Sequence, residues 1–296
     1  MHISDLLSID TSRLLGEDSS VPEKDLAAYE EKICGAAEKM DQLRRDGIGP
    51  DGSSVLFPHL PYLLEENRLI DEEERKALLH LGETGKAQDV LISIGIGGSY
   101  LGNQVLFDIF CGTYWNERTR AERGGYPKVY FAGKNMDPVE LTELAEEIRR
   151  CASHMDRKPK VLLLIISKSG TTLEPVTAFR VLKELLSPFC EITEMAITDK
   201  EKGWLRADAR AQHMPCFTVP DGIGGRFSVF SQVGLVFAAL LGIPVREFLS
   251  GARVVEEACR DKDPEKNPAL LLAVGLQYAG PVVAEHRLGR GAEGKA

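Results

Sequence analysis

Short apolar runs alternate with amphipathic stretches from residue 89 onward, and this alternation predicts the central fold. The runs have the composition of strands buried on both faces of a sheet and cover Val90–Ile94, Lys128–Ala132, Val161–Ile166, Ile192–Ile197 and Cys216–Val219. Between them, helical periodicity predicts helices over Tyr100–Phe110, Pro138–Arg150, Leu173–Leu186 and Glu201–Arg210. Alternating strands and helices form right-handed βαβ units, so we expect an α/β fold in which helices cover both faces of a five-stranded parallel sheet.

The region before the sheet is predicted to be helical. Apolar residues recur every three or four positions between Glu23 and Leu43, which indicates a helix with one buried face. The residues expected on that face are Leu26, Tyr29, Ile33, Ala36, Ala37 and Met40. The glycine- and proline-rich stretch Asp46–Gly52 then breaks the pattern. Leu60–Leu81 is expected to form two short helices, the second of them capped by Asp71.

The region after the last strand is also predicted to be helical. One helix is expected from about Ser228 to Leu241, and two more are expected over Val245–Arg260 and Pro268–Tyr278. We therefore divide the chain into an N-terminal helical segment (1–50), a central domain (51–244) and the incomplete beginning of a second domain (245–296).

A polar loop follows the strand over Val161–Ile166 and is the first candidate site. It consists of Ser167, Lys168, Ser169, Gly170, Thr171 and Thr172. A helix begins directly after it, at the carboxyl end of the strand, where open α/β sheets bind their ligands. Hydroxyls, an ammonium group and the N–H groups of a helix N-terminus together suit a phosphate monoester. Thr171 and Glu174 are also expected to form a capping box, which accounts for Glu174 without catalysis.

Two glycine-rich loops follow other strands. Gly95–Ser99 follows the first strand, but Tyr100 stands where a dinucleotide-binding fingerprint needs glycine, so the glycines more simply allow close approach of a ligand to the backbone. In Asp221–Ser228, Arg226 follows two glycines, and its planar guanidinium suits an oxyanion or an enediolate oxygen. Asp137, in contrast, precedes a proline and is expected only to cap a helix.

Composition excludes several classes of protein. The formal net charge of −9 over 296 residues argues against nucleic-acid binding. No apolar run approaches the roughly 20 residues of a membrane span, and the first residues do not resemble a secretory signal. The six cysteines are scattered, as expected of reduced thiols in a cytoplasmic protein, and no His or Cys cluster indicates a metal site.

Taken in order, the three loops resemble those of the glucose-6-phosphate isomerase family, and the stretch Asp221–Gly234 is the most specific match. The resemblance covers about Asp51 to Tyr278. It implies a sugar-isomerase (SIS) domain, which is a flavodoxin-like three-layer sandwich. The family interconverts glucose 6-phosphate and fructose 6-phosphate in glycolysis and gluconeogenesis, without metal or organic cofactor and usually as a cytoplasmic homodimer.

The resemblance also implies roles for individual residues. Gly98 and Ser99 would contact the sugar, and Arg226 would stabilise the enediol intermediate. The residues that would surround the phosphate are Ser167, Lys168, Ser169, Gly170, Thr171 and Thr172.

The family's general base is not found in this sequence. In the family it is a glutamate beyond the arginine loop, followed by a Ser-x-Gly-Lys turn, and a histidine and a lysine of a second SIS domain complete the site. The tail Pro281–Ala296, including Glu285, His286 and Glu293, does not match this pattern. We therefore expect an N-terminal portion of the enzyme that binds sugar phosphate weakly and barely isomerises it.

Two alternative functions stay open. A non-catalytic SIS module of a regulator would also bind sugar phosphate, although the first 50 residues show no DNA-binding helix-turn-helix. Another SIS isomerase would act on a pentose or amino-sugar phosphate, but the arginine loop argues against it because that loop is peculiar to the glucose-6-phosphate enzyme.

Overall fold

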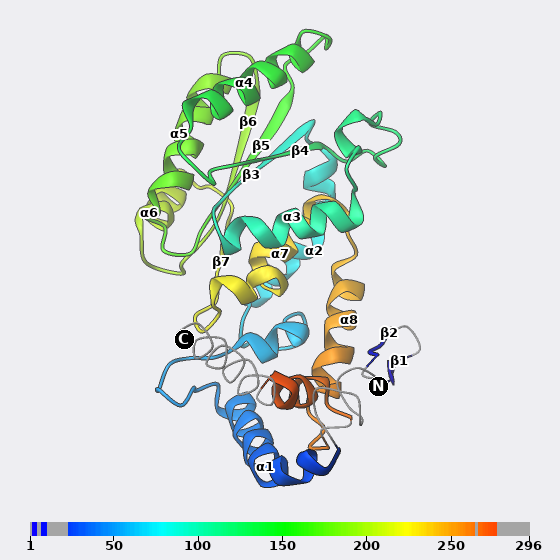
Figure 1. Ribbon diagram of the computed structural model, residues 1–296. Helices are drawn as coiled ribbons and strands as arrows, with labels where there is room; N and C mark the ends of the chain where they lie inside the picture. Colours follow the sequence, from blue (N-terminus) through cyan, green and yellow to red (C-terminus); the bar gives the residue numbers. More distant parts are fainter. Residues whose placement is uncertain (1, 5–6, 11–22, 264–265, 277–296) are drawn as a thin grey trace, which may run out of the picture. The chain divides into compact units, whose positions relative to one another are not determined.

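A computed structural model describes residues 2–4, 7–10, 23–263 and 266–276 (Figure 1). Its internal contacts divide the chain into two compact units, one formed by Ser54–Leu249 and the other by Met1–Ser53 together with Ser250–Ala296. The segments that the sequence sets apart as 1–50 and 245–296 thus fall largely within one unit. Helix α8 (Val245–Ala258) crosses the boundary at residue 250. In the described ranges, no helix is both long and apolar enough to cross a membrane.

The larger unit contains a parallel five-stranded sheet, as the sequence predicts. Its strands are β3 (Val90–Ile94), β4 (Lys128–Ala132), β5 (Lys160–Ser167), β6 (Glu191–Thr198) and β7 (Cys216–Thr218). They are ordered β4-β3-β5-β6-β7 and all neighbouring pairs are parallel. In chain order this is 2-1-3-4-5, the flavodoxin-like arrangement, whose switch point lies between the first and third strands. Here that point lies between β3 and β5.

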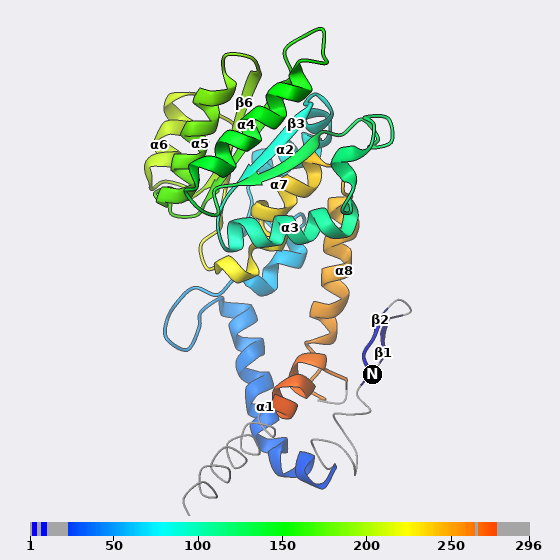
Figure 2. The ribbon, with the colours of Figure 1, turned by 45° about the horizontal axis from the view of Figure 1, so that its top comes forward.

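Helices cover both faces of the sheet, so the three-layer fold is confirmed (Figure 2). Strand β5 shows the cause: Leu162, Leu164 and Ile166 belong to one apolar cluster and the residues between them to the other, all without solvent exposure. The first cluster contains residues of α2 (Glu72–Lys86), α3 (Gly98–Phe110) and α7 (Gln232–Leu240). The second contains residues of α4 (Pro138–Ala152), α5 (Leu173–Leu186) and α6 (Trp204–Ala211).

Two predicted helix caps are confirmed. The Asp71 side chain accepts a hydrogen bond from the Glu74 amide at 2.8 Å, and the Asp137 side chain accepts one from the Val139 amide at 2.9 Å. Both carboxylates therefore satisfy amides that a helix N-terminus leaves unpaired.

Two predicted helices differ from the structure in type or in starting residue. The first of the two expected over Leu60–Leu81 is a 3-10 helix, η1 (Phe57–Tyr62), with prolines at its start and inside it. Helix α6 begins three residues later than expected because the Asp199 carboxylate holds the amides of Glu201 and Lys202 in a turn, at 2.8 and 2.7 Å.

The helix expected from Ser228 to Leu241 is divided into two elements. A 3-10 helix, η3 (Gly225–Phe230), precedes α7, and Ser231 separates them as the N-cap of α7. All nine residues of α7 are buried, so this helix anchors the arginine loop to the core.

The smaller unit contains α1 (Glu23–Asp46) and a two-stranded sheet of β1 (His2–Ser4) and β2 (Leu7–Ser8). Ile33 and Ala37 are buried on α1 as the periodicity predicts, whereas Ala36, expected on the same face, is exposed.

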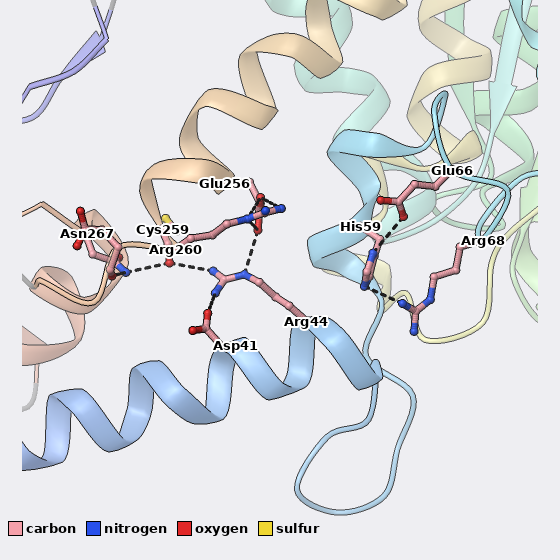
Figure 3. A network of polar contacts seen from close by, with 10 residues as sticks. Asp41, Arg44, His59, Glu66, Arg68, Glu256, Cys259, Arg260 and Asn267 are labelled. Carbon is pink, nitrogen blue, oxygen red and sulfur yellow. Dashed lines mark hydrogen bonds and ion pairs between the residues drawn. The ribbon is translucent and has the colours of Figure 1, made fainter.

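Arg44 joins the N-terminal and C-terminal segments of the smaller unit. Its Nε donates to Glu256 Oε1 at 3.0 Å, and its Nη2 donates to the Cys259 carbonyl at 2.9 Å (Figure 3). Residues 268–276 are helical, as expected, and Asn267 Oδ1 accepts hydrogen bonds from the amides of Ala269 and Leu270 at their start.

Candidate functional site

The three loops singled out in the sequence meet in the larger unit. Lys168 Nζ donates to the Ile223 carbonyl at 2.8 Å, which joins the phosphate loop (residues 167–172) to the arginine loop (residues 221–228). Ser228 Oγ donates to the Gly98 carbonyl at 3.2 Å, which joins the arginine loop to the start of α3. The loop Gly95–Ser99 follows β3 and the phosphate loop follows β5. These are the strands at the switch point, so the loops meet where flavodoxin-like sheets bind ligands.

Four hydroxyls of the phosphate loop form one hydrogen-bonded group. Ser167 is the last residue of β5 and is 3% exposed, and its Oγ lies 3.3 Å from Thr172 Oγ1. Ser169 Oγ lies 3.2 Å from Thr172 Oγ1 and accepts a hydrogen bond from Thr171 Oγ1 at 3.1 Å. Neighbouring hydroxyls at the start of a helix can turn together toward phosphate oxygens, each donating its proton.

Gly170 gives this loop its tight turn. Its φ is +65°, and its amide donates to the Ser167 carbonyl at 3.0 Å. A Cβ atom at Gly170 would lie 2.9 Å from Thr198 Oγ1 and 3.3 Å from Gly203 Cα. Backbone conformation and packing therefore both require glycine at this position.

The expected capping box between Thr171 and Glu174 is wrong. The N-cap of α5 is Thr172, and its side chain makes no capping hydrogen bond. The Thr171 hydroxyl is directed at Ser169 instead. The hydroxyls thus bond to one another rather than to the helix, and the N-terminus of α5 is left without a side-chain cap, as an anion site at that end requires.

Two cationic side chains belong to the meeting loops. Lys168 is exposed, and because an ammonium group has three protons it can hold the Ile223 carbonyl and still donate to an anion. Arg226 is exposed in the first turn of η3 and makes no hydrogen bond or ion pair with any residue in the part of the chain that the structure describes. Its guanidinium can therefore serve a ligand.

The backbone of the loop Gly95–Ser99 touches that of the arginine loop. A Cβ atom at Gly98 would lie 2.8 Å from Gly225 Cα and closer still to the Gly225 carbonyl. Gly98 therefore lets the arginine loop reach α3, a structural role beside the sugar contact that the resemblance implies. Ser99 follows it in the first turn of α3 and is half-buried.

Sequence reasoning missed two features of this site. The Ser228 hydroxyl and the Ile223 carbonyl both join loops, yet neither residue type nor spacing signals such a contact. The loops contain no glutamate or histidine, and Asp221 is their only carboxylate. Glu285, His286 and Glu293 lie outside the described residues. Within the described ranges, no group of three or more His, Cys, Asp or Glu side chains is placed to hold a metal ion.

The family model and the curated relatives that match this chain agree on one family. The model of the phosphoglucose isomerase family matches residues 48–286. A glucose-6-phosphate isomerase of Pediococcus pentosaceus is 35% identical over 254 residues, which cover 84% of this chain and 53% of that protein. One of Streptococcus equi subsp. zooepidemicus is 36% identical over 248 residues, which cover 82% of this chain and 52% of that protein. The chain thus spans about half the length of these curated relatives.

A solved structure also matches the fold. The crystal structure of a hypothetical protein from Thermus thermophilus has a TM-score of 0.64 and 26% sequence identity, over 86% of this chain and 54% of that chain.

Proposed function

Because the chain belongs to the phosphoglucose isomerase family, we propose that its three-loop site binds a 6-phosphosugar and serves the interconversion of glucose 6-phosphate and fructose 6-phosphate. The observation that carries this proposal is the meeting of the loops through Lys168 and Ser228. It gathers a hydroxyl cluster, a helix N-terminus and two cations, which complement the roughly two negative charges of a phosphate monoester.

The phosphate would lie on the loop after β5. The hydroxyls of Ser169, Thr171 and Thr172 and the N-terminus of α5 would donate to its oxygens, and Lys168 would supply a positive charge. The remainder of the sugar would extend toward Gly98, Ser99 and Arg226. Arg226 would then hold the negative charge that develops on an enediolate, because its guanidinium is planar and permanently charged.

Isomerisation also needs a base that moves a proton between C1 and C2 of the sugar. The three loops offer neither glutamate nor histidine for this task. Loss of a general base typically lowers a rate about 10²–10⁴-fold. We therefore propose that the 296-residue chain binds 6-phosphosugars but isomerises them slowly. A coupled assay that finds turnover comparable with that of full-length relatives would contradict this part of the proposal.

The absence of glutamate and histidine from the three loops also favours one alternative, a module that binds sugar phosphate without converting it. Both functions predict binding, so only turnover separates them. Slow but measurable isomerisation that Arg226→Ala abolishes supports the enzyme, whereas binding with no turnover above the uncatalysed rate supports the module.

The phosphate site is tested by Lys168→Ala and isothermal titration with 6-phosphogluconate and with gluconate. A hydrogen bond to a charged group contributes about 1.5–3 kcal/mol, so affinity for the phosphorylated ligand should fall roughly 10–150-fold. Affinity for gluconate should change little. Lys160→Ala removes an exposed lysine at the start of β5, at the opposite end of that strand from the phosphate loop, and is the matched control. Equal losses for both ligands would place Lys168 away from the phosphate.

A further inference from the structure

Ser228 is a buried polar residue next to the exposed end of the arginine loop. It is 5% exposed, and its Oγ lies 2.7 Å from the Gly225 carbonyl and 3.2 Å from the Gly98 carbonyl. The first acceptor belongs to η3 and the second to α3. A hydroxyl has a single proton, so these two carbonyl oxygens share it, and the longer of the two bonds ties η3 to α3.

The contact around this hydroxyl is a close one. The first turn of η3 lies beside the N-terminal turn of α3, shown in yellow and turquoise in Figures 1 and 2. Gly98 and Gly225 touch there through their backbones. Val229 of η3 also packs against α3, since a Cβ atom at Gly102 would lie only 3.1 Å from Val229 Cβ, and the Ser228 hydroxyl adds a directional hydrogen bond to these apolar contacts.

Ser228 also connects the loop to the core. Its carbonyl accepts the Ser231 hydroxyl at 2.6 Å and the Ser231 amide at 2.9 Å. Ser231 is fully buried and is the N-cap of α7. On the other side of Arg226, the Ile223 carbonyl is held by Lys168 at 2.8 Å. Arg226 thus lies between two anchored points, three residues after one and two before the other.

We propose that Ser228 is a positioning residue that acts through Arg226. Its hydroxyl holds η3 against α3 and thereby sets where the Arg226 guanidinium lies relative to Ser99 and to the phosphate loop. The exposed Arg226 side chain has no fixed contact of its own among the described residues, so its position depends on the backbone from which it extends. This inference rests on the proposed function, because it assigns Arg226 to a bound sugar phosphate.

The inference is tested by a double-mutant cycle of Ser228→Ala and Arg226→Ala, with isothermal titration of 6-phosphogluconate and of inorganic phosphate. Ser228→Ala should weaken 6-phosphogluconate binding about 3–10-fold, as loss of one hydrogen bond implies. Inorganic phosphate binding should stay within about 2-fold, because the loop after β5 is untouched. In the Arg226→Ala background, Ser228→Ala should have no further effect, because residues that act through one group are not additive.

Matched variants separate positioning from folding. Ser228→Thr keeps the hydroxyl and should restore most of the affinity. Ser153→Ala removes a hydroxyl that donates, as Ser228 does, to the carbonyl three residues earlier, here Arg150 at 2.7 Å, and because it lies outside the three loops it should leave binding unchanged. If Ser228→Ala does not fold, Ser228→Cys replaces it in the cycle, since a thiol has a similar size and donates only weakly.

The outcomes separate this inference from the proposed function. If the wild-type chain fails to bind 6-phosphogluconate, the proposed function is wrong. If it binds and Arg226→Ala weakens binding, independent effects of the two substitutions, or an equal loss for inorganic phosphate, overturn the role of Ser228 alone.

Discussion

Replacing Gly98 with alanine should separate the arginine loop from α3. The new Cβ atom would lie 2.8 Å from Gly225 Cα and closer to the carbonyl carbon and oxygen of that residue. Ordinary contacts between a carbon and a carbonyl oxygen are about 3.3–3.6 Å, so the two backbones would have to move apart by roughly 1 Å. Such a shift breaks the hydrogen bond from Ser228 Oγ to the Gly98 carbonyl.

The expected cost follows from overpacking a close contact. Such substitutions typically lower the free energy of unfolding by about 1–3 kcal/mol, and the better helix propensity of alanine returns at most about 1 kcal/mol. For a unit the size of Ser54–Leu249, each kcal/mol lowers Tm by roughly 2–4 °C. Gly98→Ala should therefore lower Tm by several degrees and weaken 6-phosphogluconate binding.

The other side of the same contact supplies the control. A Cβ atom at Gly225 would meet nothing closer than Gly98 Cα at 3.9 Å, an ordinary distance. Gly225→Ala should thus leave the free energy of unfolding within about 0.5 kcal/mol of the wild-type value. Calorimetric unfolding and isothermal titration of both variants are the assays. Equal stability of the two variants would refute the reasoning from this contact.

Three further predictions concern the pH dependence of stability, the reactivity of the thiols and the role of Arg226. Burial disfavours the charged form of Asp89, but the Arg157 hydrogen bonds, the Lys160 amide and the charges of Arg157 and Arg120 outweigh it and hold the pKa of this carboxyl below its usual range. The stability that the Asp89 carboxylate contributes is therefore complete above its usual pKa and is lost as pH falls through the lowered one. Asp89→Asn should lower the free energy of unfolding by about 2 kcal/mol at neutral pH and reduce its pH dependence below about pH 4, as measured by urea unfolding. An unchanged pH dependence below about pH 4 would contradict this. Burial raises the pKa of the Cys111 and Cys190 thiols to about 11. A maleimide at mildly alkaline pH should therefore modify exposed Cys34 first and leave these two thiols unmodified until the chain unfolds. Peptide mass mapping tests this, and early modification of Cys111 or Cys190 would disprove it. Under the proposed function, Arg226→Lys should lower kcat more than it raises KM, because a point charge cannot replace a planar fork. A higher KM with unchanged kcat would count against a role in the transition state.

The sheet was predictable because short apolar runs in the sequence indicate its strands. Wholly apolar runs such as Val161–Ile166 are typical of strands buried on both faces, and the structure extends this one by a single residue at each end, to Lys160–Ser167. The caps at Asp71 and Asp137 follow from residue type and position alone and are confirmed.

Features that depend on distant parts of the chain were not predictable. One local feature was also missed: the hydroxyls of Thr171 and Thr172 bond to Ser167 and Ser169 within the same loop rather than form a capping box, because nearby hydroxyls compete with the helix amides as partners. The contact of Arg44 with Glu256 joins residues 212 positions apart, and no periodicity in the sequence reports it. The same holds for Lys168 and the Ile223 carbonyl, 55 positions apart, on which the candidate site depends.

A crystal structure of the chain with 6-phosphogluconate tests the central claim most directly. The account predicts the phosphate on the hydroxyls of residues 167–172 and the carboxylate end of the sugar acid within reach of Ser99 and Arg226. A phosphate group bound elsewhere, with these loops unoccupied at saturating ligand, would contradict it.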